Sequence, residues 1–292
     1  MNKIEYNINI FFSPFYKMPL WGRFKKIATI HDVHFTKLVL RKGISRFKPY
    51  TFFLKRIIRC ADKIITVSEF SKNMLIKQFK APENKIKLVY NGVDPKFKIV
   101  DRSNFDILRS KYNVSFKYIL YVGNLKKHKN VKGLIKAYSL LSDAQKNLYK
   151  LIIIAKHIES FKHLQRIVER LGLEDNVYFL DSVEDDDLVL FYNFAEMFVF
   201  PSYYEGFGLP PLEAMACGTP VISSYATSLK EVLGDSALYI NPYSIQEIAQ
   251  RIQELLNYQQ LRSSLIEKGK IHVQEFSPKK FAANLYREIE GI

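Results

Sequence analysis

The chain has 292 residues, 48% of them hydrophobic, which is long enough for two domains and too apolar for a disordered protein. Its net charge of +15 comes from the N-terminal third: residues 1–98 carry 21 Lys and Arg against 6 Asp and Glu, and residues 99–292 carry 23 of each. No apolar run reaches the roughly 18 residues of a membrane-spanning helix, and the first residues lack the basic-then-apolar order of a secretion signal. The two distant cysteines, Cys60 and Cys217, argue against a disulfide framework and favour a reducing cytosol.

The first third of the chain alternates apolar, β-rich runs with helical patterns, which predicts parallel α/β units. The expected strands are residues 8–13, 26–31, 63–67 and 85–89, and the expected helices are residues 50–60 and 68–79. Ser68 is the expected N-cap of the second helix. A turn-rich cluster at residues 91–95 indicates a domain boundary.

The excess positive charge includes a segment, residues 44–60, in which five Lys and Arg side chains alternate with aromatic and aliphatic ones. This pattern suits a basic helix on an anionic membrane surface, and a solvated helix is the equal alternative. A nucleic-acid-binding protein is a third hypothesis, but no helix-turn-helix, zinc or RNA-binding signature supports it.

The remainder of the chain repeats the strand–helix alternation and predicts a second doubly wound domain. Its expected strands are residues 118–123, 150–155, 177–180, 197–201, 220–223 and 237–240. Its expected helices are residues 131–141, 158–171, 185–194, 211–216, 245–256 and 259–273, with a last one at 277–290. We expect domains at residues 1–97 and 98–276, a final helix (277–292) that crosses back to the first domain, and ligands at the carboxyl ends of the strands.

The segment 201–223 carries the strongest functional signal. Glu205 and Glu213 flank a glycine loop, Gly206-Phe207-Gly208, and two prolines that open a helix. A helix N-terminus attracts phosphate, and glycine lets the backbone approach it closely. Because a carboxylate one turn into that helix can accept hydrogen bonds from a sugar diol, the loop predicts a nucleotide-sugar site.

This segment resembles the nucleotide-sugar loop of retaining GT-B glycosyltransferases of the glycosyltransferase 4 family (group 1), in which two glutamates are separated by seven residues. Residues 29–32, 64–71, 90–94 and 121–130 resemble other segments of the same family, and the wording is most similar to bacterial mannosyltransferase-like members. The resemblance implies an α/β fold of GT-B type, with two Rossmann-like domains and a cleft between them. It also implies an incomplete N-terminal domain, since family members usually have further strands and a glycine-rich loop before a stretch like residues 11–14.

The resemblance also assigns roles in donor binding. Lys129 corresponds to the lysine that stabilises the leaving diphosphate, and Asn124 stands where the family often has an arginine, with Lys126, Lys127 or His128 as candidates to compensate. Glu205 would contact the donor hexose and Glu213 the ribose. The remaining expected donor contacts are Gly123, Val183 at the base, Gly206, Phe207, Gly208 and Leu209.

His31 would lie beside the donor sugar and orient or polarise it. Retention is expected through front-face attack, with the leaving phosphate accepting the proton of the acceptor, so Glu205 is not expected to be a nucleophile. The acidic residues 184–187 are typical of a helix start, and no metal or other cofactor is expected.

The sequence therefore predicts a retaining hexosyltransferase that moves mannose or another hexose from GDP-mannose or a UDP-hexose to a glycan or lipid-linked acceptor. The expected setting is polysaccharide or lipopolysaccharide synthesis at the cytoplasmic face of the inner membrane. A partner chain that supplies N-terminal strands is a further expectation, and nucleic acid is not an expected partner. The alternative is an inactive or partner-dependent nucleotide-sugar-binding remnant of such an enzyme.

Overall fold

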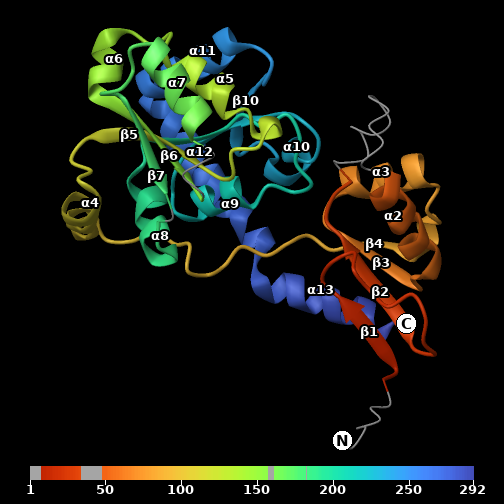
Figure 1. The fold of residues 1–292 in the computed structure, drawn as a ribbon. Coiled ribbons are helices and arrows are strands. Elements are labelled where there is room, and N and C mark those ends of the chain that lie inside the picture. Colours follow the sequence, from red (N-terminus) through yellow and green to blue (C-terminus); the bar gives the residue numbers. More distant parts are fainter. Residues whose placement is uncertain (1–7, 34–47, 157–160, 182) are drawn as a thin grey trace, which may run out of the picture. The chain divides into compact units, whose positions relative to one another are not determined.

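The structure is a computed structural model that describes residues 8–33, 48–156, 161–181 and 183–292. It divides into two compact units (Figure 1). Unit 1 comprises Met1–Gly92 together with Lys279–Ile292, and unit 2 comprises Val93–Pro278. Each unit is built around its own parallel sheet, which confirms the predicted α/β class.

Unit 1 contains a four-stranded parallel sheet in the order β1-β2-β3-β4. Its strands are β1 (Ile10–Ser13), β2 (Lys25–Ile30), β3 (Lys63–Thr66) and β4 (Ile86–Leu88). Its helices are α2 (Lys48–Cys60), α3 (Glu69–Phe79) and α13 (Pro278–Glu290), with a 3₁₀ turn at Glu83–Lys85. As predicted, Ser68 caps α3: its hydroxyl oxygen accepts the Ser71 N–H at 3.0 Å.

Helices cover both faces of the unit 1 sheet. Successive strand residues point to opposite sides, so neighbouring residues pack in different layers. Ala28 and Ile64 pack in one apolar cluster with residues of α2 and α3. Their neighbours Ile27 and Ile65 pack in another, together with residues of α13. The Lys63 ammonium lies 3.0 Å from the Glu288 carboxylate and adds a polar tie between β3 and α13.

Unit 2 contains a six-stranded parallel sheet in the order β10-β9-β8-β5-β6-β7. Its strands are β5 (Lys117–Val122), β6 (Tyr149–Ala155), β7 (Val177–Asp181), β8 (Met197–Phe200), β9 (Val221–Ser224) and β10 (Ala237–Ile240). β5, β6, β8 and β9 are fully buried over most of their length, as expected for a parallel sheet covered on both faces. Because all six strands run in one direction, the loops that leave their carboxyl ends lie along one edge.

The helices of unit 2 pack on this sheet and on one another. They are α4 (Phe105–Tyr112), α5 (Val131–Tyr138), α6 (Asp143–Leu148), α7 (Lys162–Arg170), α8 (Asp185–Phe194), α9 (Leu209–Ala216), α10 (Leu229–Leu233), α11 (Ile245–Asn257) and α12 (Gln259–His272). In the described residues, 3₁₀ turns lie at Arg102–Asn104, Lys127–Lys129 and Val273–Phe276. α5 contacts both α7 and α11, and these three helices lie together at the top of Figure 1, whereas α8 contacts α9.

Both cysteines are free, Cys217 buried and Cys60 half-buried. Burial raises the pKa of the Cys217 thiol to about 12, so it stays protonated and unreactive near neutral pH. Within the described ranges, no helix combines the length and hydrophobicity needed to cross a bilayer.

Candidate functional site

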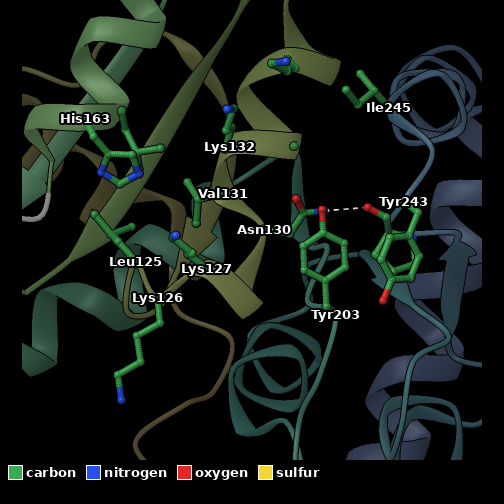
Figure 2. A pocket seen from close by; sticks show the side chains of 14 residues that line it. Leu125, Lys126, Lys127, Asn130, Val131, Lys132, His163, Tyr203, Tyr243 and Ile245 are labelled. Atoms are coloured by element: carbon green, nitrogen blue, oxygen red, sulfur yellow. Dashed lines mark hydrogen bonds between the residues drawn. The ribbon is translucent and has the colours of Figure 1, made fainter. Parts of the chain in front are cut away.

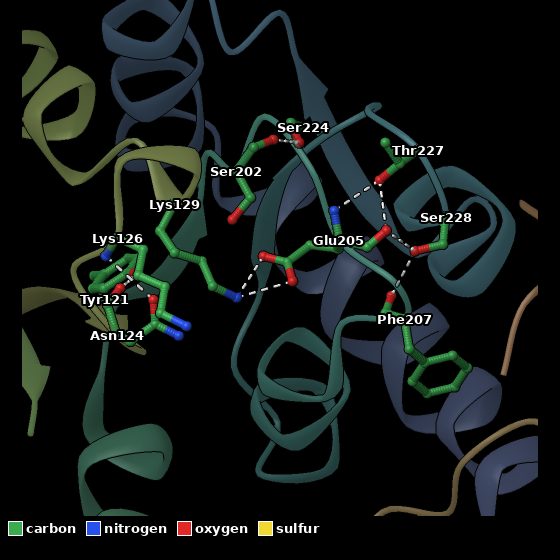
Figure 3. A network of polar contacts seen from close by, with 10 residues as sticks. All are labelled: Tyr121, Asn124, Lys126, Lys129, Ser202, Glu205, Phe207, Ser224, Thr227 and Ser228. Atoms are coloured by element: carbon green, nitrogen blue, oxygen red, sulfur yellow. Dashed lines mark hydrogen bonds and ion pairs between the residues drawn. The ribbon is translucent and has the colours of Figure 1, made fainter. Parts of the chain in front are cut away.

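The candidate site lies at the carboxyl edge of the unit 2 sheet, where the loops after three neighbouring strands meet. β5, β8 and β9 are adjacent in the sheet, and the loops that follow them carry Lys129, Glu205 and Thr227 respectively. Figure 3 shows the Lys129 side chain directed at the Glu205 carboxylate and the Thr227 hydroxyl directed at the Glu205 backbone. The strand order therefore gathers residues that are far apart in the sequence.

Lys129 and Glu205 form the central ion pair of the site. The Lys129 Nζ lies 2.8 Å from Oε1 and 2.9 Å from Oε2 of Glu205, and the side chains are only 13% and 11% exposed. The same Nζ lies 5.2 Å from the centre of the Phe200 ring, within range of a cation–π contact. An ammonium and a carboxylate are thus held together, largely shielded from water, where electrostatic interactions are strong.

The backbone of the Glu205 loop is fastened to the loop after β9. The Glu205 N–H donates to Thr227 Oγ1 at 2.9 Å, and the Thr227 and Ser228 hydroxyls donate to the Glu205 carbonyl at 2.9 and 3.1 Å. Ser228 also donates to the Phe207 carbonyl at 3.2 Å. These bonds, drawn in Figure 3, hold the glycine loop in one conformation before any ligand arrives.

The glycine loop leads directly into α9. Gly208 adopts φ +107° at the N-cap, a backbone conformation that disfavours any side chain, and a Cβ there would lie 2.6 Å from Leu229 Cδ2. Phe207 is buried, with its ring against Phe276, so its side chain belongs to the core. Gly206 is half-buried, and Leu209 begins the helix. Because Pro210 and Pro211 have no N–H, the backbone N–H groups that this helix end presents are those of Gly208 and Leu209.

Glu213 lies about one turn into α9 and is half-buried. The Tyr192 hydroxyl donates to its Oε2 at 2.9 Å. Burial raises the pKa of the Glu213 carboxyl above its usual range, although the bond from Tyr192 opposes the shift. A desolvated carboxylate of this kind gains much from any further hydrogen-bond donor, such as a ligand hydroxyl.

A cavity of about 390 Å³ brings together Gly123, Asn124 and Val183. Much of its wall is aliphatic, from β5, β6 and α8, with Lys156 and Asp185 also on the lining. Gly123 adopts φ +150°, and the buried Tyr121 hydroxyl donates to the Asn124 carbonyl at 2.9 Å, which shapes the start of the loop. The Asn124 side chain accepts the Lys126 N–H at 3.2 Å, so it stabilises its own loop instead of reaching out as an arginine would.

His31 belongs to unit 1 and is described within that unit. One ring nitrogen lies 2.9 Å from the Pro14 carbonyl oxygen, and the Phe15 ring centre is 6.0 Å away. The imidazole is exposed, and the loop after β1 orients it.

The site also contains two residues that the sequence analysis missed, Thr227 and Ser228. The signal that could have found them is their position just after the strand that neighbours β8. No group of three or more His, Cys, Asp or Glu side chains in the described part of the chain is placed to hold a metal ion.

Comparison with known proteins identifies the family. Residues 104–272 match the model of the glycosyl transferases group 1, and residues 5–97 match that of the glycosyltransferase family 4. The chain belongs to the group 1 glycosyl transferases. The predicted family is therefore confirmed.

Two curated relatives of this glycosyltransferase are named O-antigen chain mannosyltransferases. The chain is 32% identical to O-antigen chain mannosyltransferase B of Escherichia coli, over 94% of this chain and 72% of the relative. It is 35% identical to O-antigen chain mannosyltransferase RfbU of Salmonella typhimurium, over 73% of this chain and 56% of the relative.

Solved structures confirm the predicted GT-B fold. Sucrose-phosphate synthase of Thermosynechococcus elongatus matches with a TM-score of 0.83 at 24% identity, over 97% of this chain and 74% of the other. HepE of Anabaena, solved in complex with UDP-glucose, matches with a TM-score of 0.79 at 21% identity, over 92% of this chain and 73% of the other.

Proposed function

We propose that this glycosyltransferase is a retaining mannosyltransferase that uses a nucleotide sugar, GDP-mannose before UDP-hexoses, and elongates a glycan or lipid-linked acceptor of a surface polysaccharide. The O-antigen mannosyltransferases among its relatives favour this donor and this class of acceptor. The observation that carries the proposal is the shielded Lys129–Glu205 pair beside the N-terminus of α9. A cation, a carboxylate and a helix N-terminus are what a sugar diphosphate requires.

The proposal assigns each part of the donor to a group in the site. The leaving diphosphate gains negative charge, which Lys129, the backbone N–H groups of Gly208 and Leu209 and the dipole of α9 would stabilise. Glu213 would accept hydrogen bonds from the ribose hydroxyls, and the cavity beside Val183 would hold the base. The diphosphate would compete with Glu205 for Lys129. This competition would release the Glu205 carboxylate, which could then bind hexose hydroxyls.

Retention is proposed to follow from attack on the face that the diphosphate leaves. The bond between the anomeric carbon and the phosphate oxygen breaks, the acceptor oxygen forms its bond on the same face, and the acceptor proton passes to the leaving phosphate. Glu205 then acts as an orienting carboxylate, unlike the nucleophile of a retaining glycosidase. Lys129 and α9 supply positive charge, so the proposed reaction needs no metal ion, and His31 of unit 1 would orient the donor sugar.

Association with an anionic membrane surface is part of the proposal. α2 exposes Phe52 beside Lys55, Arg56 and Arg59, a basic and aromatic surface suited to a lipid interface. We expect the protein to sediment with vesicles that contain about a third phosphatidylglycerol but not with pure phosphatidylcholine vesicles. Equal behaviour with both vesicle types would remove the membrane, and with it the cytoplasmic inner-membrane location, from the proposal.

A second candidate is a chain that binds the donor but needs a partner for turnover. The observation behind it is that β1 is an edge of the described sheet of unit 1, with Ile10 exposed. Strand edges of this kind pair readily with another chain.

The test is incubation of the chain with GDP-mannose or a UDP-hexose and a glycan acceptor. Release of GDP, with a product whose anomeric configuration by NMR matches that of the donor, supports the retaining enzyme. Saturable donor binding without turnover supports the partner-dependent alternative. Absence of both turnover and binding contradicts the two proposals together.

A further inference from the structure

A second cavity, of about 470 Å³, lies at the same edge of the unit 2 sheet among residues of α5, α7 and the loop before α11 (Figure 2). Its lining includes four lysines, Lys126, Lys127, Lys132 and Lys136, together with His163. None of the described residues on its wall is Asp or Glu. It shares the loops after β5 and β8 with the donor site, because Tyr203 lies on the loop that carries Glu205, whereas α5, α7 and the loop before α11 form the rest of its wall.

The positive charge of this cavity is not neutralised by the part of the chain that the structure describes. No ion pair involves any of the four lysines there, whereas Lys129 on the same loop is paired with Glu205. Lys132 and Lys136 are four positions apart on α5 and therefore lie on one side of that helix. A concave surface with uncompensated positive charge concentrates anions.

The cavity also carries an aromatic pair. The rings of Tyr203 and Tyr243 stack with their centres 4.7 Å apart and an interplanar angle of 26°. Tyr243 is 77% exposed, so the pair offers a large apolar face to a ligand. An aromatic face has negative potential and attracts polarised C–H groups such as those of a sugar ring.

The wall between the lysines and the tyrosines is held by buried polar contacts. Asn130 adopts φ +57° and donates from Nδ2 to the Pro242 carbonyl at 2.7 Å, which ties the start of α5 to the loop that bears Tyr243. Gly133 leaves room for this amide, since a Cβ there would lie 2.4 Å from Asn130 Oδ1. The Tyr203 N–H donates to the His128 carbonyl at 2.7 Å. The cavity is thus shaped in advance.

We propose that this cavity is a binding site, separate from the donor site, for an anionic saccharide, meaning a sugar that carries a phosphate or a carboxylate. The lysines bind the anionic group, and the tyrosine pair stacks on the sugar ring. A bare anion would not use the tyrosines, and a neutral sugar would not use the lysines. The site does not depend on which nucleotide sugar is the donor.

The test is calorimetric titration of the full chain, with the donor site saturated by GDP, using mannose 6-phosphate, glucuronate and neutral mannose as probes. We expect at least one anionic probe to bind saturably and to weaken with added salt, and mannose not to bind measurably. The two anionic probes distinguish a phosphorylated from a carboxylated ligand.

Two variants separate the contributions, and a third is the matched control. Lys132→Ala/Lys136→Ala and Tyr243→Ala should each weaken the bound probe by about tenfold, the scale of one lost charge contact or ring contact. Lys230→Ala/Lys268→Ala removes the same charge from two exposed lysines of unit 2 outside the cavity and should leave binding unchanged.

Three results would overturn the proposal: no binding of either anionic probe, equal binding by the two lysine double variants, or inorganic phosphate binding as tightly as mannose 6-phosphate with no effect of Tyr243→Ala. Because Lys132 and Tyr243 are exposed, the variants are expected to keep the wild-type melting temperature, which circular dichroism checks. Should Lys132→Ala/Lys136→Ala have a lower melting temperature than the wild type, Lys132→Gln/Lys136→Gln replaces it and must show the same loss of affinity for the anionic probe. Since the cavity is probed with GDP present, its failure is distinguishable from failure of the donor site.

Discussion

Replacing Lys129 by methionine leaves the Glu205 carboxylate buried without its counter-ion. At the 2.8 Å that separates Nζ from Oε1, the attraction is about 6 kcal/mol for an effective dielectric constant of about 20. Most of this attraction offsets the cost of withdrawing two ions from water, so the intact pair contributes little net stability. Removal of one partner is different, because the remaining charge keeps its desolvation cost. We expect Lys129→Met to lower the free energy of unfolding by about 3 kcal/mol.

The assay is a double-mutant cycle by thermal and chemical denaturation. Lys129→Met and Glu205→Gln should each lower the melting temperature by about 6–12 °C, whereas the double variant should unfold near the wild type. The control is Lys270→Met, which breaks an exposed pair with Glu267 and should cost less than about 1 kcal/mol. Donor binding gives the functional reading: both variants that lack Lys129 should lose affinity for GDP-mannose, including the stable double variant.

Two outcomes would refute this reasoning. If the double variant loses as much stability as the two single variants added together, the two charges are not coupled and their proximity is not energetically important. If the double variant binds GDP-mannose like the wild type, Lys129 does not contact the diphosphate.

Three further predictions concern the same site. Burial raises the pKa of Glu213, so the folded state binds more protons than the unfolded state. The free energy of unfolding should therefore fall as pH rises from the usual carboxyl pKa through the raised one. Glu213→Gln should remove this pH dependence from melting temperatures measured between about pH 4 and pH 8, and it should weaken nucleotide binding. Gly208→Ala should cost about 2 kcal/mol in denaturant unfolding because of its φ of +107° and the contact with Leu229, and more than Gly172→Ala, where φ is +62° and no atom lies within 4 Å of the added Cβ. Activity with GDP-mannose should survive removal of divalent metal ions with EDTA, and a loss restored by Mg²⁺ would contradict the proposed role of Lys129.

The strands were predictable because buried parallel strands leave a strong trace, short β-branched runs bounded by turn residues. Helices with a clear apolar face were found too, such as α11, which buries four residues. α4, α6 and α10 were missed. α4 buries only Leu108, α6 buries no residue, and α10 has only five residues, so none of them shows a full apolar stripe.

The candidate site was predictable as a list of residues but not as a set of contacts. The glycine loop identified Glu205 and Glu213 from local chemistry alone. That Lys129 pairs with Glu205 depends on β5 and β8 being neighbours, and strand order is a tertiary property that the sequence spacing does not contain. The fastening of the loop by Thr227 and Ser228 depends in the same way on β9.

The central claim, that unit 2 binds a nucleotide sugar through Lys129 and Glu213, is tested most directly by calorimetric titration of GDP-mannose and UDP-glucose into the wild type and two variants. We predict saturable binding, with GDP-mannose the tighter ligand, and a loss of about tenfold or more in both Lys129→Met/Glu205→Gln and Glu213→Gln. Binding of neither nucleotide sugar, or unchanged affinity in both variants, would contradict it.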